Sequence, residues 1–456
     1  MSVDTESRVR RAVRAFGDAI PVPPGDPAAA LAAASRARGP RPRIRLAMPV
    51  AAAAVLALVA AVAVLPALLA ARIPTGTGAS AGAGSRPATL PDHFAGYSYL
   101  TGDVSTSPPG RAIALYTHGA GVELMDFPQS LVLSADRDAY RRVDLAHARG
   151  GPEMQGDPAP STLAPDGTRV AVGDPGGRHG DLAVLDLASG AVRAYPVHSG
   201  RSVIPLAWSP DSGTLAYYSV PHAAELFAGS PRGGQLGLLD LSSGQAADLP
   251  GNADVATAVF APDGGELAVQ GSMYSPIRVI GRDGTDRREL AAPEGALLDG
   301  GSGWSPDGAL LAATVGTRTV FLDASRTGAP TPAAVPSAPL VGWRDARTAL
   351  TFGGWNSSAA DVDAYRLFEV SLRDGSHRTV SEIPTGFNAN YKPSAPQLAT
   401  ALVAGMRVRP AGAPDRGPWP TWAWVTLAVV QGVPALLVAA WAYRRRRAGA
   451  GTPVTR

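Results

Sequence analysis

The amino-acid sequence predicts an all-β fold, a β-propeller of six or seven blades, flanked by two transmembrane helices. One turn sequence occurs four times, as LAPDG from Leu163, WSPDSG from Trp208, FAPDG from Phe260 and WSPDG from Trp304, each followed by an apolar run. The aspartates of these turns lie 45, 52 and 44 residues apart, close to the length of a four-stranded blade. Two uncharged apolar stretches bracket the repeats, and these predict the membrane helices.

Residues 1–45 precede the first apolar stretch and are basic, with nine arginines against four acidic residues, a net charge of +5. Four apolar residues recur with helical spacing on one stripe, while most arginines fall elsewhere: Val9, Val13, Phe16 and Ile20. Pro21 is expected to end this helix. The pattern predicts a short helical cytoplasmic segment that lies on anionic lipid, serves as a spacer or docks a partner protein.

Residues 46–71 form the first apolar stretch, 26 residues without a charge. At about 1.5 Å per helical residue they exceed the ~30 Å hydrocarbon core of a bilayer, which predicts a transmembrane helix. A cleavable signal peptide is disfavoured because the basic segment before it and the apolar run are both too long. Residues 419–443 predict a second transmembrane helix, since they are uncharged and carry tryptophan or tyrosine at both ends.

The charges predict the topology. The tail, residues 444–456, carries five arginines and no acidic residue, another +5. Both termini are therefore expected in the cytoplasm, which makes a two-pass protein of the cell membrane with an extracytoplasmic propeller. Because the whole chain has a formal charge of +3, the part between its basic ends carries −7. The basic residues thus indicate topology, and no nucleic-acid partner is expected.

Composition divides the region between the spans and constrains its chemistry. Residues 72–90 are rich in Gly, Ala, Ser, Thr and Pro and predict a flexible stalk, followed by the propeller at 91–410 and a linker at 411–418. The chain has no cysteine, so the exported domain must be stable without disulfides. Arginine replaces lysine almost throughout, with Lys392 as the exception, and alanine and glycine are abundant. This usage is typical of a GC-rich actinobacterial genome.

Each repeat is expected to contribute two hairpins, and hence four strands, to one blade. In the Pro-Asp-Gly turn, proline fixes φ at the first corner, aspartate bonds back to the backbone and glycine adopts a positive φ. The bulky residue before the turn is placed to fill the gap against the neighbouring blade. Degenerate copies begin near Val341 and Ser105, which gives six units. The stretch from residue 388 is either the remnant of a seventh unit or a closing strand.

The repeated WSPDG or FAPDG followed by a Leu-Ala strand resembles the TolB-type, WD40-like propeller repeat over roughly residues 95–400. That resemblance implies the fold, but such propellers serve as binding platforms, as gating domains of peptidases and as parts of envelope complexes. The Gly-His and Trp-Asp pairs of eukaryotic WD40 repeats are absent, and no α/β-hydrolase domain follows. The resemblance therefore predicts a fold and leaves the function open.

No catalytic, cofactor-binding or metal-binding residue is predicted. The turn aspartates, Asp166 among them, are expected to bond their own turns, and Asp361 and Asp363 to lie in a solvated loop without the twelve-residue calcium pattern. The histidines fall in different units with no pair at helical or hairpin spacing and no cysteine to join them, so a zinc site has no support. They are His93, His118, His147, His179, His198, His222 and His377.

These observations favour a non-enzymatic, membrane-anchored propeller outside the membrane that binds or senses a protein or ligand. Its expected partners are the lipid bilayer and envelope proteins, and no cofactor is expected. One alternative is a transmembrane regulator with the topology of an anti-sigma factor and residues 1–45 as its output. Another is a propeller enzyme of the lyase or lactonase type. Carboxylates and histidines that converge on an axial pocket favour the enzyme, whereas small and apolar groups favour binding.

Overall fold

The structure is a computed structural model, and the chain divides into two units, Thr75–Leu427 and Met1–Pro74 with Ala428–Arg456. The described residues are 86–120, 128–151, 154, 156–221, 233–325, 328, 330–354, 364–385, 392–421 and 423–427, with isolated positions up to 444. The predicted cytoplasmic segment 1–45, the predicted helix 46–71, and Asp361 and Asp363 lie outside them.

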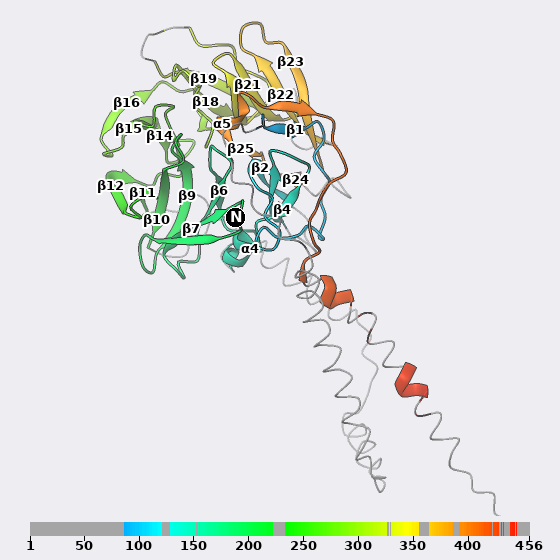
Figure 1. Ribbon diagram of the computed structural model, residues 1–456. Coiled ribbons are helices and arrows are strands. Elements are labelled where there is room, and N and C mark those ends of the chain that lie inside the picture. The colour runs from blue at the N-terminus through cyan, green and yellow to red at the C-terminus, as the bar shows by residue number, and fades with distance from the viewer. Residues whose placement is uncertain are drawn as a thin grey trace, which may run out of the picture. The chain divides into compact units, whose positions relative to one another are not determined.

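Six β-sheets follow one another around a ring in the first unit (Figure 1). Five of them, which we number blades two to six, are antiparallel meanders of consecutive strands. Blade two comprises β5 (Ser161–Leu163), β6 (Arg169–Val172), β7 (Asp181–Asp186) and β8 (Val192–Pro196). Blade three comprises β9 (Ser202–Trp208), β10 (Thr214–Val220), β11 (Gln235–Asp240) and β12 (Ala246–Ala253). Blade four comprises β13 (Thr257–Phe260), β14 (Glu266–Gln270), β15 (Ile277–Gly281) and β16 (Asp286–Leu290).

The last two of these blades complete the meander series. Blade five has β17 (Leu297–Leu298), β18 (Leu310–Val315) and β19 (Arg318–Asp323), with Val335 bridging to Thr319 where a fourth strand would lie. Blade six comprises β20 (Leu340–Asp345), β21 (Thr348–Gly353), β22 (Ala364–Ser371) and β23 (His377–Pro384). The predicted two hairpins are present in blades two, three, four and six, whereas in blade five a single bridge takes the place of the fourth strand. The all-β expectation is confirmed.

Blade one is built from both ends of the propeller chain. Its strands β2 (Ala112–Ala120), β3 (Gln129–Ser134) and β4 (Tyr140–Arg142) come from the start, and β24 (Lys392–Pro393) and β25 (Gln397–Leu398) pair with β2. The stretch from residue 388 thus supplies the closing strand, and the propeller has six blades. Two short helices follow these strands in the chain: α4 (Asp144–Gly150) comes after β4, and α5 (Thr400–Val403) comes after β25.

The aspartate of each repeated turn bonds its own turn, as predicted. Asp166 accepts the backbone N–H of Thr168 at 2.9 Å, and Asp211 accepts that of Gly213 at the same distance. Asp263 and Asp307 repeat the arrangement. These bonds explain why aspartate recurs beside proline and glycine, and they leave the carboxylates engaged locally.

The bulky residue before each turn connects one blade to the next. The indole N–H groups of three such tryptophans donate to backbone carbonyls of the preceding blade: Trp208 to Thr162 at 3.1 Å, Trp304 to Val259 at 3.3 Å and Trp343 to Ser302 at 2.9 Å. All three rings are buried. The prediction that these residues fill the gap between blades is confirmed. Each indole hydrogen bond also fixes the position of the ring relative to the preceding blade.

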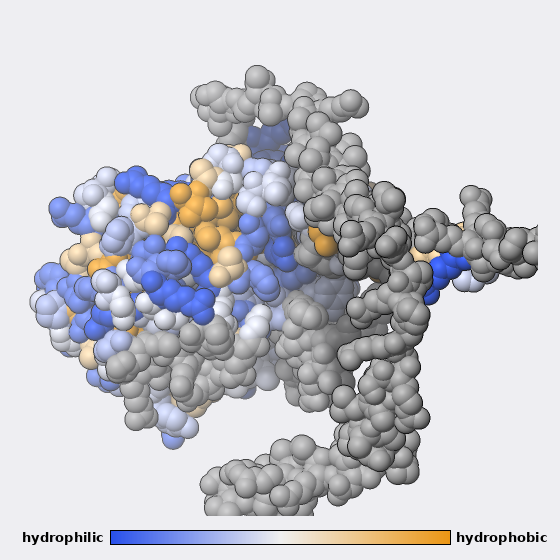
Figure 2. Space-filling model, turned by 90° about the horizontal axis from the view of Figure 1, so that it is seen from below, coloured by the Kyte–Doolittle hydropathy of each residue, from blue (hydrophilic) through white to orange (hydrophobic). Residues whose placement is uncertain are grey.

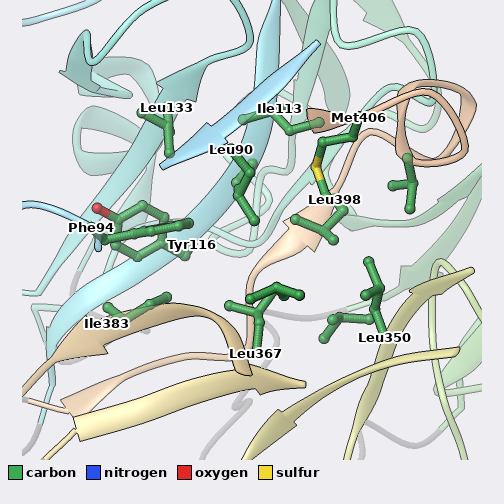
Figure 3. Close-up of a cluster of buried hydrophobic side chains, with 14 of the residues drawn as sticks. Leu90, Phe94, Ile113, Tyr116, Leu133, Leu350, Leu367, Ile383, Leu398 and Met406 are labelled. Carbon is green, nitrogen blue, oxygen red and sulfur yellow. The ribbon is translucent and has the colours of Figure 1, made fainter. Parts of the chain in front are cut away.

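A second pairing joins the two chain ends outside blade one. Strand β1 (Thr89–Pro91) runs parallel to β26 (Arg407–Arg409). Figure 3 shows Leu90 from β1, Leu398 from β25 and Met406 in one buried cluster with side chains of blades one and six. Residues 88–90, expected as the end of a flexible stalk, are thus part of the folded propeller, because Leu90 fills its core.

The C-terminal part of the described chain is helical at residues 423–427 and 438–442, and at single positions between and after them. No helix among the described positions is both long and apolar enough to cross a membrane. Several large apolar side chains of the predicted span 419–443 are exposed: Trp419, Trp424, Val425, Leu427, Val430, Val438 and Trp441. The predicted transmembrane helix therefore stays a prediction.

Candidate binding site on the propeller axis

The first strands of several blades enclose a cavity of about 510 Å³. Its lining comes from β5, β9, β17, β20 and the closing strand β25, which are the inner strands of five of the six blades. The cavity therefore lies on the axis of the ring. Most of its side chains are apolar: Leu163, Leu206, Trp208, Leu297, Leu298, Leu340, Val341 and Leu398.

Asp299 is the one ionisable residue among the described residues that line this cavity. It follows β17 directly and is 5% exposed. Its Oδ1 accepts a hydrogen bond from the Thr314 hydroxyl at 2.6 Å, and its Oδ2 accepts the Leu340 N–H at 3.1 Å. Burial raises the pKa of Asp299 to about 6, although both hydrogen bonds act to lower it. The carboxylate joins blade five to blade six.

Gln397 is the largest uncharged polar side chain of the lining, and it serves the closure of the ring. Its Oε1 accepts the backbone N–H of Leu163 at 3.1 Å, and its Nε2 donates to the Ser161 carbonyl at 2.9 Å. The first strand of blade two ends in Leu163, where blades three to six have tryptophan or phenylalanine. The glutamine of the closing strand therefore supplies there the inter-blade hydrogen bonds that indole groups supply elsewhere.

The histidines do not converge on the cavity, since none of the six described histidines belongs to its lining. His118 is buried beside Tyr97 and Tyr116, whereas His93 is largely exposed and His198 contacts Asp248 at 2.9 Å. His222 lies outside the described residues. Within the part of the chain that the structure describes, no three His, Asp or Glu residues are grouped as a metal site would require.

Sequence reasoning did not single out Asp299. It stands in the sequence LLDGGSGW, where Asp-Gly-Gly-Ser-Gly separates a two-residue inner strand from Trp304. In blades three and four the inner strand runs directly into the aromatic residue, at Trp208 and Phe260. This interruption of the inner strand is the signal that could have drawn attention to the residue.

The outer surface offers a smaller site between blades four and five. The β14–β15 connection exposes Tyr274 almost completely and Met273 in part, beside a cavity of about 380 Å³ that Glu289 and Glu294 also line. In the view of Figure 2 the described surface is mostly hydrophilic, with one larger hydrophobic group near its middle and smaller ones elsewhere. Tyrosine and methionine are enriched at protein interfaces, whereas glutamate is depleted there.

Solved structures that the protein resembles are propellers of low sequence identity. TolB from Acinetobacter baumannii is 15% identical with a TM-score of 0.43, and the match covers 63% of this chain and 67% of TolB. An oligogalacturonate lyase in complex with manganese is 16% identical with a TM-score of 0.40, covering 63% of this chain and 77% of the lyase. The β-propeller domain of Cps50 (Swd1) from Myceliophteria thermophila is 15% identical with a TM-score of 0.34, covering 50% and 72%.

The resemblance to TolB and to a WD40-type domain that the repeat predicts is thus found among solved structures. No family model matches the chain, and no curated protein matches it. The six sheets and their strand order carry the fold by themselves. A propeller fold by itself does not decide between binding and catalysis.

Proposed function

We propose that this protein is a membrane-anchored, extracytoplasmic propeller that binds or senses a protein or ligand in the cell envelope, without catalysis of its own. The character of the axial cavity carries this proposal. A lyase or hydrolase mechanism requires at least two groups that donate, accept or coordinate at the reacting bond. Asp299 is the one ionisable group in the described lining, whose other side chains are apolar or uncharged, and its two hydrogen bonds come from Thr314 of blade five and Leu340 of blade six.

The way in which the chain enters and leaves the propeller supports the anchored arrangement. The Arg86 carbonyl accepts a bond from Arg111, which also pairs with Asp136 in the hairpin between β3 and β4. At the other end, Asp415 exchanges backbone hydrogen bonds with Asp138 and Tyr140 of the same hairpin. Both described ends of the propeller chain therefore lie beside one hairpin of blade one, as two anchors on one side of a ring would require.

The exposed side chains after residue 418 also support an anchor. In a water-soluble helix, large apolar residues gather on one buried stripe. Here Trp424, Val430, Val438 and Trp441 are each more than 40% exposed. Lipid would cover them without any further protein contact. Membrane insertion thus accounts for an apolar surface that would otherwise favour aggregation.

Affinity capture from membranes tests the binding proposal. The full-length protein in lipid nanodiscs, with and without residues 1–40, is expected to retain the same envelope partners. Partners that disappear with residues 1–40 would favour the transmembrane regulator instead. Reproducible turnover of a polysaccharide or lactone by the full-length protein would favour the propeller enzyme and contradict our proposal.

Reporter fusions at both termini test the topology. Activity of a cytoplasm-dependent reporter is expected at residue 1 and at residue 456, and of an export-dependent reporter at the surface turn around Asp374. An export-dependent signal at the C-terminus would contradict the two-span arrangement.

A further inference from the structure

The carboxylate of Asp299 has no cationic side chain beside it in the cavity. The described lining contains no arginine, lysine or histidine, and none of the ion pairs found among the described residues includes Asp299. Buried carboxylates in proteins are normally paired with a cation because desolvation of an isolated charge is costly. The axis of the propeller therefore holds one negative group whose counter-charge the described chain does not provide.

Asp299 also retains unused acceptor capacity toward the cavity. A carboxylate offers about four lone-pair sites, and the Thr314 hydroxyl and the Leu340 N–H occupy two of them. Gln397 does not compete for a bound molecule, since both ends of its amide already bond to blade two. A ligand at this position would meet one charged acceptor and, from Thr162, Ser302 and Thr400 of the lining, hydroxyl groups that can accept as well as donate. It should therefore donate hydrogen bonds, and a positive charge would strengthen them.

The apolar residues of the lining indicate the chemistry of the part of the ligand that does not contact Asp299. Leu297 is 40% exposed although it belongs to an inner strand, and Leu206 is partly exposed on the neighbouring wall. Apolar groups that face a cavity favour an apolar occupant. The volume of about 510 Å³ is in the range of roughly 300–1,000 Å³ that small-molecule sites occupy.

We propose that the axial cavity binds a small primary amine with an apolar body, whose ammonium group bonds Asp299 while its body contacts Leu297 and Leu206. This inference rests on the proposed binding function and names a ligand class for it. An ammonium group has three donors and no acceptor, which complements the free lone pairs of the carboxylate.

Three probes of one shape test the proposal: 2-phenylethylamine, 2-phenylethanol and 3-phenylpropionate. Calorimetric titration of the full-length protein in nanodiscs at pH 7.5 is expected to show the amine binding at least about tenfold more tightly than the alcohol, with the carboxylate weakest. Empty nanodiscs correct for partition of the probes into lipid. Equal affinity for the amine and the alcohol would overturn the proposal with no variant required.

Two substitutions at the site and one elsewhere test whether the charge of Asp299 causes the preference for the amine. Asp299→Asn is expected to weaken amine binding about 10- to 100-fold and to leave the alcohol unchanged. Thr314→Val removes a neutral hydrogen bond from the same carboxylate and should keep the preference for the amine. Asp374→Asn, in an exposed turn of blade six, is the matched control and should behave as wild type.

The outcomes separate this inference from the function on which it rests. If none of the probes binds, or if Asp299→Asn binds the amine as tightly as wild type, the amine site is wrong. Capture of envelope proteins by the same preparation would nevertheless uphold the binding platform. Amine binding without any captured protein would support a ligand sensor and contradict a protein-binding platform.

Discussion

Blade three and blade one share one strand plan, but their connectivity differs. Blade three uses one continuous stretch, β9 to β12, and each strand pairs with the next along the chain. In blade one the backbone N–H of Thr117 donates to Ser394, 277 positions later. Pairing over such a separation costs loop-closure entropy that a hairpin does not incur. We therefore expect additional contacts to stabilise blade one, and the structure contains them.

The additional contacts are charged side chains that hold the C-terminal strap, residues 407–417, against blade one. The Arg141 side chain is buried and donates to the carbonyls of Ser107, Tyr140 and Asp415, and to the Asp415 carboxylate. Arg409 bonds both carboxylate oxygens of Asp138. Blade three has no comparable arrangement among its described residues. The comparison teaches that closure depends on a few long-range polar contacts, whereas the other blades depend on local hairpins.

The largest expected effect comes from removal of the strap contact. Arg141→Ala should lower the free energy of unfolding by about 3 kcal/mol, because the buried bond to the Tyr140 carbonyl and the partly buried bonds to Ser107 and Asp415 are lost together. Hydrogen exchange should then quicken first in β2, β4 and the strap. Arg193→Ala, which removes an exposed guanidinium stacked on Tyr195 at a blade edge, should cost less than about 1 kcal/mol. Equal costs for both variants would remove the distinction between blade one and the others.

The free energy of unfolding should depend on pH through Asp299, the residue that connects blades five and six. The pKa of Asp299 in the folded protein, about 6, lies above its ordinary value of 3.8, so the native state binds this proton more tightly than the unfolded state. This stabilisation is present below about pH 4 and is lost as the pH rises through about 6. Its size is about 3 kcal/mol, from about two pKa units.

Chemical unfolding of wild type and Asp299→Asn at several pH values measures this effect. The stability of the variant relative to wild type should rise by about 3 kcal/mol between pH 4 and pH 7.5, whatever the cost of the lost Leu340 bond. Asp374→Asn should change little relative to wild type over this range, because hydrogen bonds from Ser376 lower the pKa of Asp374 to about 2, so that its stabilisation is lost only as the pH falls from about 4 to about 2. A parallel pH profile for Asp299→Asn and wild type would contradict the burial of an unpaired carboxylate.

A smaller effect is expected at the contact between blades two and three. Trp208→Phe keeps an aromatic ring in the gap but loses the bond to the Thr162 carbonyl, so unfolding free energy should fall by about 1–2 kcal/mol. Blade four has Phe260 at the equivalent position and provides the internal reference. Thermal unfolding would detect the change, and an unchanged midpoint would mean that ring packing alone joins these blades.

The smallest expected effect is a gain of stability in blade three. Ser212 has a φ of 57°, and its buried hydroxyl has no hydrogen-bond partner among the described residues. Glycine occupies this turn position in the other copies, at Gly167, Gly264 and Gly308. Ser212→Gly should therefore stabilise the protein by about 1 kcal/mol, and Gly308→Ser should destabilise it by a similar amount. Matching denaturant titrations check both signs, and destabilisation by Ser212→Gly would contradict the argument from backbone strain.

The sequence by itself determined the blade, because turn and strand preferences are local. Pro-Asp-Gly turns, apolar strands and the recurring aromatic residue predicted two hairpins per unit, and the hydrogen bonds of Asp166, Asp211 and Trp208 confirm each role. The absence of a predicted catalytic or metal-binding constellation followed from spacing alone and is not tested by the structure. The membrane spans rest on hydropathy, and they too stay predictions.

Only the tertiary structure decided how many blades form and what lies at their centre. Six blades and not seven result because the closing strand completes blade one, a pairing that no local signal encodes. The sequence around Asp299 shows only an interrupted inner strand, and it is ring closure that brings β17, β18 and β20 together around the carboxylate. Local preferences depend on residues a few positions apart. Closure and the axial cavity depend on contacts between distant segments, whose energies appear only once the chain has folded.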